Sequence, residues 1–209
     1  TGVIPESICN LYSNLNSFSI DNNQLCPIYP SCLNYYDFDS QDISECAEWE
    51  CEEGYVELWY ECYSIENTIS LNLENSGLLG EIPPEIGNLT NVLYVDLNDN
   101  NLTGEIPPEI INIAEPRRLN LENNQLTGMI PPEIGEFNYR LNYLFLKNNQ
   151  FSGVSENICD LNIWWSNDSR FSISGNQICW PYPDCIEDYM GEQDISDCTP
   201  CQHGVEGHV

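Results

Sequence analysis

Apolar and polar residues alternate at a fixed spacing through the middle of the chain. Copies that start at Leu71, Val95 and Leu119 run apolar, polar, apolar, and then reach a Ser or Asn three residues on and a Leu two residues later. These copies are 24 residues apart; a fourth starts at Leu144 after 25 residues, and a degenerate fifth at Phe171. Alternation of this kind predicts a short strand with one buried face in each copy. Because one copy cannot bury that face alone, we expect the copies to stack into a curved solenoid. The strands should be centred near Leu71, Val95, Leu119, Leu144 and Ile173.

The segments that follow the predicted strands share a second pattern. Residues 78–87, 102–110 and 126–135 read LLGEIPPEIG, LTGEIPPEI and LTGMIPPEIG. Gly permits a tight bend and Pro favours an extended segment after it. The three copies resemble the plant-specific class of the leucine-rich repeat family, over about residues 66 to 178. The resemblance implies an α/β-type solenoid, a horseshoe of short parallel strands with a mostly irregular convex side and disulfide-stapled caps.

A longer repeat duplicates the segment that follows the solenoid. Residues 7–46 and 157–198 share the order of their cysteines, an F-S-I-x-x-N-Q motif and a final Q-D-I-S-x-C, at an offset of about 150 residues. We therefore expect part of a tandem array of such modules. The expected divisions are a half-repeat and cap of a preceding module (1–46), a disulfide-bearing lead-in segment (47–65), central repeats (66–170), a second cap (171–198) and the start of the next lead-in segment (199–209).

Eleven cysteines indicate an oxidising compartment, so we expect the protein outside the cell or at the cell surface. Each cap carries a quartet, and a quartet allows three pairings that the sequence does not separate. The pair in the lead-in segment should bond to itself, and Cys201 lacks an equivalent partner. The cysteines expected to be oxidised are Cys9, Cys26, Cys32, Cys46, Cys51, Cys62, Cys159, Cys179, Cys185 and Cys198.

Charge excludes one class of partner. The chain of 209 residues has 5 Lys and Arg against 34 Asp and Glu, a formal charge of −29, whereas nucleic-acid binding relies on cations that neutralise phosphates. A hydrophobic fraction of 41% is enough for a packed core. No apolar run approaches the roughly 20 residues that a bilayer-spanning helix needs.

Catalytic, metal and cofactor sites are not expected. Cys198, Cys201, His203 and His208 have ligand chemistry for zinc, but Cys198 is a cap cysteine equivalent to Cys46, which favours a disulfide. These two histidines are the only ones in the chain, so no histidine-based catalytic set can form within the repeats. The acidic clusters in the caps lack the spacing of a known calcium loop. Three N-x-S/T sequons are as many as chance predicts.

The cations are unevenly distributed. All five lie between residues 117 and 170, and three of them fall at outward strand positions beside aromatic residues. Aromatic and Arg residues are enriched at binding hot spots. The alternative is that the cations balance Glu74, Asp96 and Glu122 on neighbouring strands. The pattern also predicts that Leu97 and Leu121 are buried while Asp96 and Asn120 are exposed on the concave face. The candidate binding residues are Tyr94, Arg118, Tyr143, Phe145, Lys147 and Arg170.

Two functions therefore remain open for an acidic, non-catalytic, protein-binding chain. In the first, tandem modules build a cell-surface assembly or filament, with copies joined head-to-tail through apolar residues near Thr1, Val3, Ile4 and Val205. In the second, the module recognises or adheres to a protein or glycan through its concave face.

Overall fold

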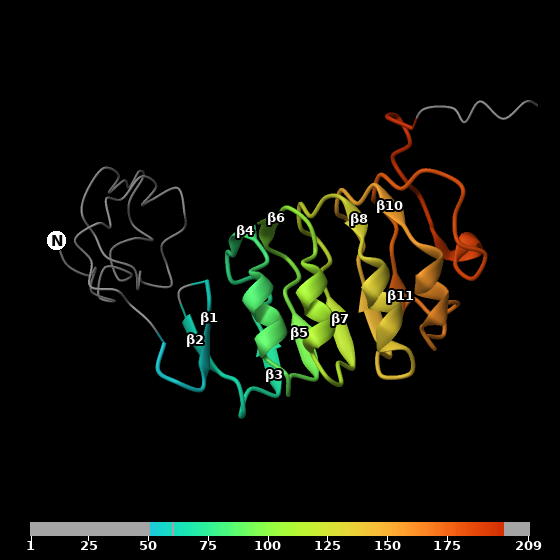
Figure 1. The fold of residues 1–209 in the computed structure, drawn as a ribbon. Coiled ribbons are helices and arrows are strands. Elements are labelled where there is room, and N and C mark those ends of the chain that lie inside the picture. The colour runs from blue at the N-terminus through green and yellow to red at the C-terminus, as the bar shows by residue number, and fades with distance from the viewer. Residues whose placement is uncertain (1–50, 60, 199–209) are drawn as a thin grey trace, which may run out of the picture.

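Five short strands, one from each repeat, form the parallel sheet that organises the molecule. A computed structural model describes residues 51–59 and 61–198. The strands pair in the order β11-β9-β7-β5-β3, so each lies beside the strand of the next repeat, and Figure 1 shows the repeats side by side in a row. The strands are β3 (Ser70–Asn72), β5 (Tyr94–Asp96), β7 (Arg118–Asn120), β9 (Tyr143–Phe145) and β11 (Phe171–Ser172). The predicted solenoid is confirmed, although β11 ends one residue before the centre that the pattern gave it.

The opposite side of the solenoid is more regular than the sequence predicted. Each IPPEI-like segment turns into a short 3₁₀ helix whose first residues are proline, which suits a helix start because proline has no amide hydrogen to donate. These helices are η2 (Pro84–Asn88), η3 (Pro108–Asn112) and η4 (Pro132–Phe137). The fourth repeat has no such prolines, and its helix η5 (Glu156–Asp160) is capped by the Ser155 side chain instead. Two small parallel sheets join the repeats a second time, β4 (Leu79–Glu81) with β6 (Asn101–Thr103) and β8 (Met129–Ile130) with β10 (Gly153–Val154).

The hydrophobic core lies between the five-stranded sheet and the row of 3₁₀ helices. Each of the first four repeats contributes a buried strand residue and a buried helix residue at equivalent positions, as Leu119 and Ile134 do in the third repeat. Leu97 and Leu121 have no exposed surface, as predicted. One face of the sheet is therefore occupied by packing, and the polar and aromatic residues of the strands lie on the other, concave face.

A buried column of asparagines holds neighbouring repeats together. The Asn124 Nδ2 donates to the carbonyl of Leu121 in its own repeat at 3.1 Å and to that of Leu97 in the preceding repeat at 2.9 Å. Its Oδ1 accepts the amide of Leu102, also in the preceding repeat, at 3.0 Å. One side chain thus bonds to backbone groups of two repeats, and it supplies the acceptor for the buried amide of Leu102. The members of the column are Asn100, Asn124, Asn149 and Asn176.

The N-terminal end of the described solenoid is closed by a hairpin. Strands β1 (Tyr55–Leu58) and β2 (Glu61–Ser64) pair antiparallel, and Val56 and Leu58 point into the core. The disulfide Cys51–Cys62 spans this lead-in segment, as predicted.

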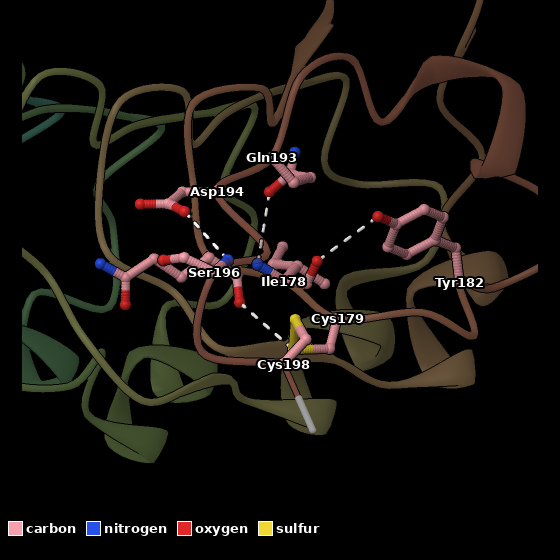
Figure 2. The surroundings of a disulfide bond; sticks show 8 residues. Ile178, Cys179, Tyr182, Gln193, Asp194, Ser196 and Cys198 are labelled. Atoms are coloured by element: carbon pink, nitrogen blue, oxygen red, sulfur yellow. Dashed lines mark hydrogen bonds between the residues drawn. A yellow bond between two sulfur atoms is a disulfide. The ribbon is translucent and has the colours of Figure 1, made fainter. Parts of the chain in front are cut away.

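Two disulfides fix the C-terminal cap, which also contains the helix η6 (Glu187–Tyr189). Of the three pairings open to the quartet, the structure has Cys159–Cys185 and Cys179–Cys198. Figure 2 shows the second of these beside Gln193, whose Oε1 accepts the amide of Ile178 at 3.4 Å. Its Nε2 donates to the carbonyl of Ile173 at 3.2 Å, so Gln193 occupies the role that the asparagine of a following repeat would have. The other quartet and Cys201 lie outside the described residues.

Candidate functional site

The concave face carries the predicted binding residues in register. Tyr94, Arg118 and Tyr143 occupy equivalent positions on β5, β7 and β9, and Arg170 immediately precedes β11. Its carbonyl accepts the amide of Leu144, which sets Arg170 beside Tyr143. This first column therefore alternates aromatic and cationic side chains across four repeats, as the sequence predicted.

The cations of the column lie against the aromatic rings. The Arg118 Cζ is 5.4 Å from the centroid of the Tyr94 ring. The Arg170 Cζ is 5.5 Å from the centroid of Tyr143 and 5.9 Å from that of Trp164. Distances of this size bring a guanidinium within the range of attraction by the electron-rich face of a ring. The column is thus preorganised, because neighbouring rings hold each Arg side chain in place in the absence of a binding partner.

Asp96 corrects one prediction about this face. Its side chain was expected to be exposed, but the residue is only 5% exposed, because the Arg118 guanidinium covers it. The Arg118 Nη2 donates to Oδ2 of Asp96 at 2.5 Å, and the Arg118 side chain itself is 39% exposed. Asn120, predicted exposed as well, is half-buried and donates to Asn98. The charge-balancing role that the sequence left as an alternative is therefore real for Arg118.

Phe145 and Lys147, the next two outward positions after Tyr143 in the fourth repeat, supply an apolar centre and a free cation. Phe145 on β9 is half-buried, with its ring centroid 6.4 Å from that of Tyr143. Lys147 follows two residues later and is exposed, with no acidic side chain in ion-pair distance within the described ranges. Beside it, the Ser172 hydroxyl donates to the Glu122 carboxylate. The unpaired cations of the concave face therefore lie in the last two described repeats, whereas Glu74 lies in the first.

Two further arginines lie on the edge of the solenoid and behave differently. The Arg140 guanidinium donates to the carbonyls of Ala114, Glu136 and Phe137, so it ties the end of η4 to the loop after η3. Arg117 is exposed and lines a pocket of about 240 Å³ with Arg140. The other residues that line it are Glu115, Tyr139 and Asn142.

Sequence reasoning missed Trp164. The residue is 70% exposed and contacts Arg170, but it lies in the loop before β11, outside the repeating positions. The only signal was the longer spacing of 27 residues between Leu144 and Phe171, where the Trp164–Trp165 pair is inserted. The next residue, Trp165, is partly buried and packs edge-on against Phe171, with ring centroids 4.8 Å apart. This packing fixes the position of the loop that carries Trp164.

Several other candidates have no structural role in this site. Cys198 is bonded to Cys179, so its sulfur is not a free zinc ligand, and the other three residues of that set lie outside the described ranges. Within residues 51–59 and 61–198, no three acidic, His or Cys side chains gather as metal ligands. The same part of the chain holds no helix that is long and apolar enough to cross a membrane. Thr1, Val3, Ile4 and Val205 also lie outside the described residues.

Comparison with known proteins agrees with the geometry. A family profile described as Leucine Rich Repeat matches residues 67–89, 91–113 and 116–137, which are the first three repeats. No curated protein matches the chain. Among solved structures, the chain is similar to the BIR2 ectodomain from Arabidopsis thaliana, with 25% identity over 71% of this chain and 80% of that one and a TM-score of 0.51. It is also similar to a chain of the BIR3–SERK2 complex from Arabidopsis thaliana, with 27% identity, coverage of 68% and 72%, and a TM-score of 0.48.

Proposed function

Because the chain contains a leucine-rich repeat solenoid, we propose that it is a non-catalytic, extracellular protein-binding module that holds its partner on the concave face. The BIR2 structure that the chain resembles is an ectodomain, which supports the extracellular part of the proposal. The disulfides at both ends of the described solenoid fit an oxidising compartment.

One observation carries the choice of face. In a molecule with a formal charge of −29, three of the five cations lie on the concave side of two neighbouring strands and the start of a third, among Tyr94, Tyr143 and Phe145. Tyr and Arg side chains bury large areas and donate directed hydrogen bonds, so they dominate the binding energy of many interfaces. Charge balance alone needs a cation only at Arg118, since no acidic residue of the described chain pairs with Lys147 or Arg170.

A matched pair of variants tests this proposal. The wild-type protein is screened against extracellular proteins, and each partner found is measured again with Phe145→Ala and with Met129→Ala. Met129 is 55% exposed on β8, outside the concave sheet, so its loss removes a similar apolar surface elsewhere. If the binding site is on the concave face, Phe145→Ala weakens binding of the partner and Met129→Ala does not. Equal effects, or an effect of Met129→Ala alone, contradict the choice of face.

The duplicated cap favours a second candidate function. Residues 7–46 repeat the cysteine order and motifs of residues 157–198, which is the pattern expected of modules in tandem. We propose that such modules form an elongated cell-surface assembly, in which copies meet head-to-tail near Thr1, Val3, Ile4 and Val205. Electron microscopy of native material tests this: rods with a regular module spacing support it, and separate curved particles contradict it. Loss of assembly on changing the ends, with Phe145→Ala harmless, separates this function from concave-face recognition.

A further inference from the structure

We propose that Arg170, held against Trp164 and Tyr143, anchors a carboxylate side chain of an acidic segment in the protein partner. The inference rests on the proposed concave-face function and adds to it the anchoring residue and the chemistry of the partner. It also assigns a role to Trp164, which lies outside the repeat positions.

The hydrogen-bond donors of Arg170 are free. Its guanidinium lies within 6 Å of the centroids of two rings, yet no residue in 51–59 or 61–198 accepts a hydrogen bond or an ion pair from it. Stacking uses the faces of a guanidinium, whereas its five N–H donors point outward in its plane. A carboxylate can accept hydrogen bonds from two of those donors at once, and such bidentate pairs are among the strongest hydrogen bonds that Arg makes.

The other arginine of the column does not have this freedom. Arg118 already donates to the buried carboxylate of Asp96, so an incoming anion would compete with an ion pair inside the protein. Arg140 is also committed, since it donates to three backbone carbonyls. Two chemically similar positions of one column thus differ in role: Arg118 stabilises the sheet, and Arg170 is left for a partner.

Trp164 gives the site its shape. The side chain is 70% exposed, and an exposed tryptophan is costly in water unless something covers it. Its loop is fixed by Trp165, which packs on the buried ring of Phe171. An extended segment that places a carboxylate on Arg170 would therefore rest its chain on the Trp164 ring, and burial of that ring adds affinity that a bare ion pair lacks.

The surrounding charge makes an acidic segment the fitting occupant. Lys147, exposed and unpaired in the described chain, lies on the same face, so two cations without an acidic partner lie near β9 and β11. Because the chain as a whole is strongly acidic, these unpaired cations are the groups here that attract a carboxylate.

Selection from a random peptide library tests the inference. Peptides are displayed as loops fused at both ends, so that Asp and Glu side chains are the only carboxylates they offer. The library is selected separately on wild type, Arg170→Gln, Arg170→Lys and Arg117→Gln. Arg117 is the matched control, because it is an exposed arginine of the solenoid edge and its replacement changes the net charge by the same amount. Thermal unfolding of each variant confirms that it is folded before selection.

We expect wild type and Arg117→Gln to select peptides with an Asp or Glu at a fixed position, and Arg170→Gln to lose that preference. A selected peptide should bind Arg170→Gln at least about tenfold more weakly, as expected for a hydrogen-bonded charge pair. Arg170→Lys should retain part of the affinity, and Trp164→Ala should weaken it without changing the preferred residue.

Three results would overturn the inference while leaving the concave-face function standing. One is a set of peptides that bind the concave face, as shown by loss with Phe145→Ala, but show no acidic preference. A second is an acidic preference that Arg170→Gln retains or that Arg117→Gln loses equally, which would reveal charge attraction without a defined site. Self-association that Arg170→Gln abolishes would assign the site to a second copy and also overturn it. Peptides unaffected by Phe145→Ala and Arg170→Gln alike would contradict the concave-face function itself.

Discussion

Asp96 and Arg118, at neighbouring positions of β5 and β7, form an ion pair that is buried on the carboxylate side and open to solvent on the guanidinium side. The pair links two repeats on the concave face, so a position that repeats through the solenoid carries a structural cation in one repeat and a free cation, Arg170, two repeats later. Their similarity in sequence hides this difference in role.

Arg118→Gln should therefore destabilise the fold, whereas Arg170→Gln should not. Removal of the Arg118 guanidinium takes away both the ion-pair partner and the cover of the Asp96 carboxylate, which we expect to lower the free energy of unfolding by about 1–3 kcal/mol. Arg170→Gln should stay within about 0.5 kcal/mol of wild type. Chemical denaturation of both variants measures the difference. Adding Asp96→Asn to Arg118→Gln should recover part of the loss, and no recovery would mean that the pair is not the cause.

Substitution in the asparagine column should lower the stability of the fold more than substitution of a surface polar residue does. Asn124→Ala removes hydrogen bonds to backbone groups of two repeats and leaves the buried amide of Leu102 without an acceptor. We expect the free energy of unfolding to fall by about 2–4 kcal/mol. Asn112→Ala, at an exposed position of η3, is the control and should cost less than about 0.5 kcal/mol. Similar losses for the two variants would contradict the role of the column.

The 3₁₀ helices stack so closely that residue 87 has no room for a side chain, which explains the glycine there. A Cβ at this position would lie 2.2 Å from the carbonyl oxygen of Glu109 in the next repeat, so the backbone of one helix would have to move. Gly87→Ala should lower the free energy of unfolding by about 1–3 kcal/mol. At Gly153 an added Cβ would meet only the flexible side chain of Met129, at 3.2 Å, so Gly153→Ala is expected to be nearly neutral. Equal stability of both variants would show that the helices tolerate wider spacing.

Peptide mapping without reduction tests the cap. The expected linked peptides join Cys159 to Cys185 and Cys179 to Cys198, together with Cys51 to Cys62. A peptide that joins Cys159 to Cys179 would contradict the structure of the cap. Each native bridge should contribute about 2–4 kcal/mol, so reduction is expected to lower the stability of both the cap and the lead-in hairpin.

The repeats were predictable because their spacing repeats. Leu97 and Leu121 alternate with polar residues at a period of two, and this period alone places them in the core. The burial of Asp96 was not predictable in the same way, since it depends on the identity of residue 118 in the next repeat. A sequence pattern gives the face of a side chain but not what covers it.

The rest of the candidate site depends on contacts that the periodic spacing of the repeats does not predict. Trp164 reaches Arg170 from an inserted loop, and its position follows from the packing of Trp165 on Phe171. The pairing of the cap cysteines likewise depends on how residues 179–198 fold over the last repeat, and there Gln193 completes hydrogen bonds that the sequence pattern assigned to no residue.

The most direct test of concave-face recognition is the dissociation constant of a protein partner for Phe145→Ala compared with Met129→Ala. Phe145 lies at the centre of the cationic and aromatic part of the concave face, and Met129 is a comparably large apolar residue on a separate sheet. We predict a loss of at least about fivefold for Phe145→Ala, the size of a moderate hot spot, and less than about twofold for Met129→Ala. A partner that binds Phe145→Ala as tightly as wild type, and Met129→Ala more weakly, would contradict the account.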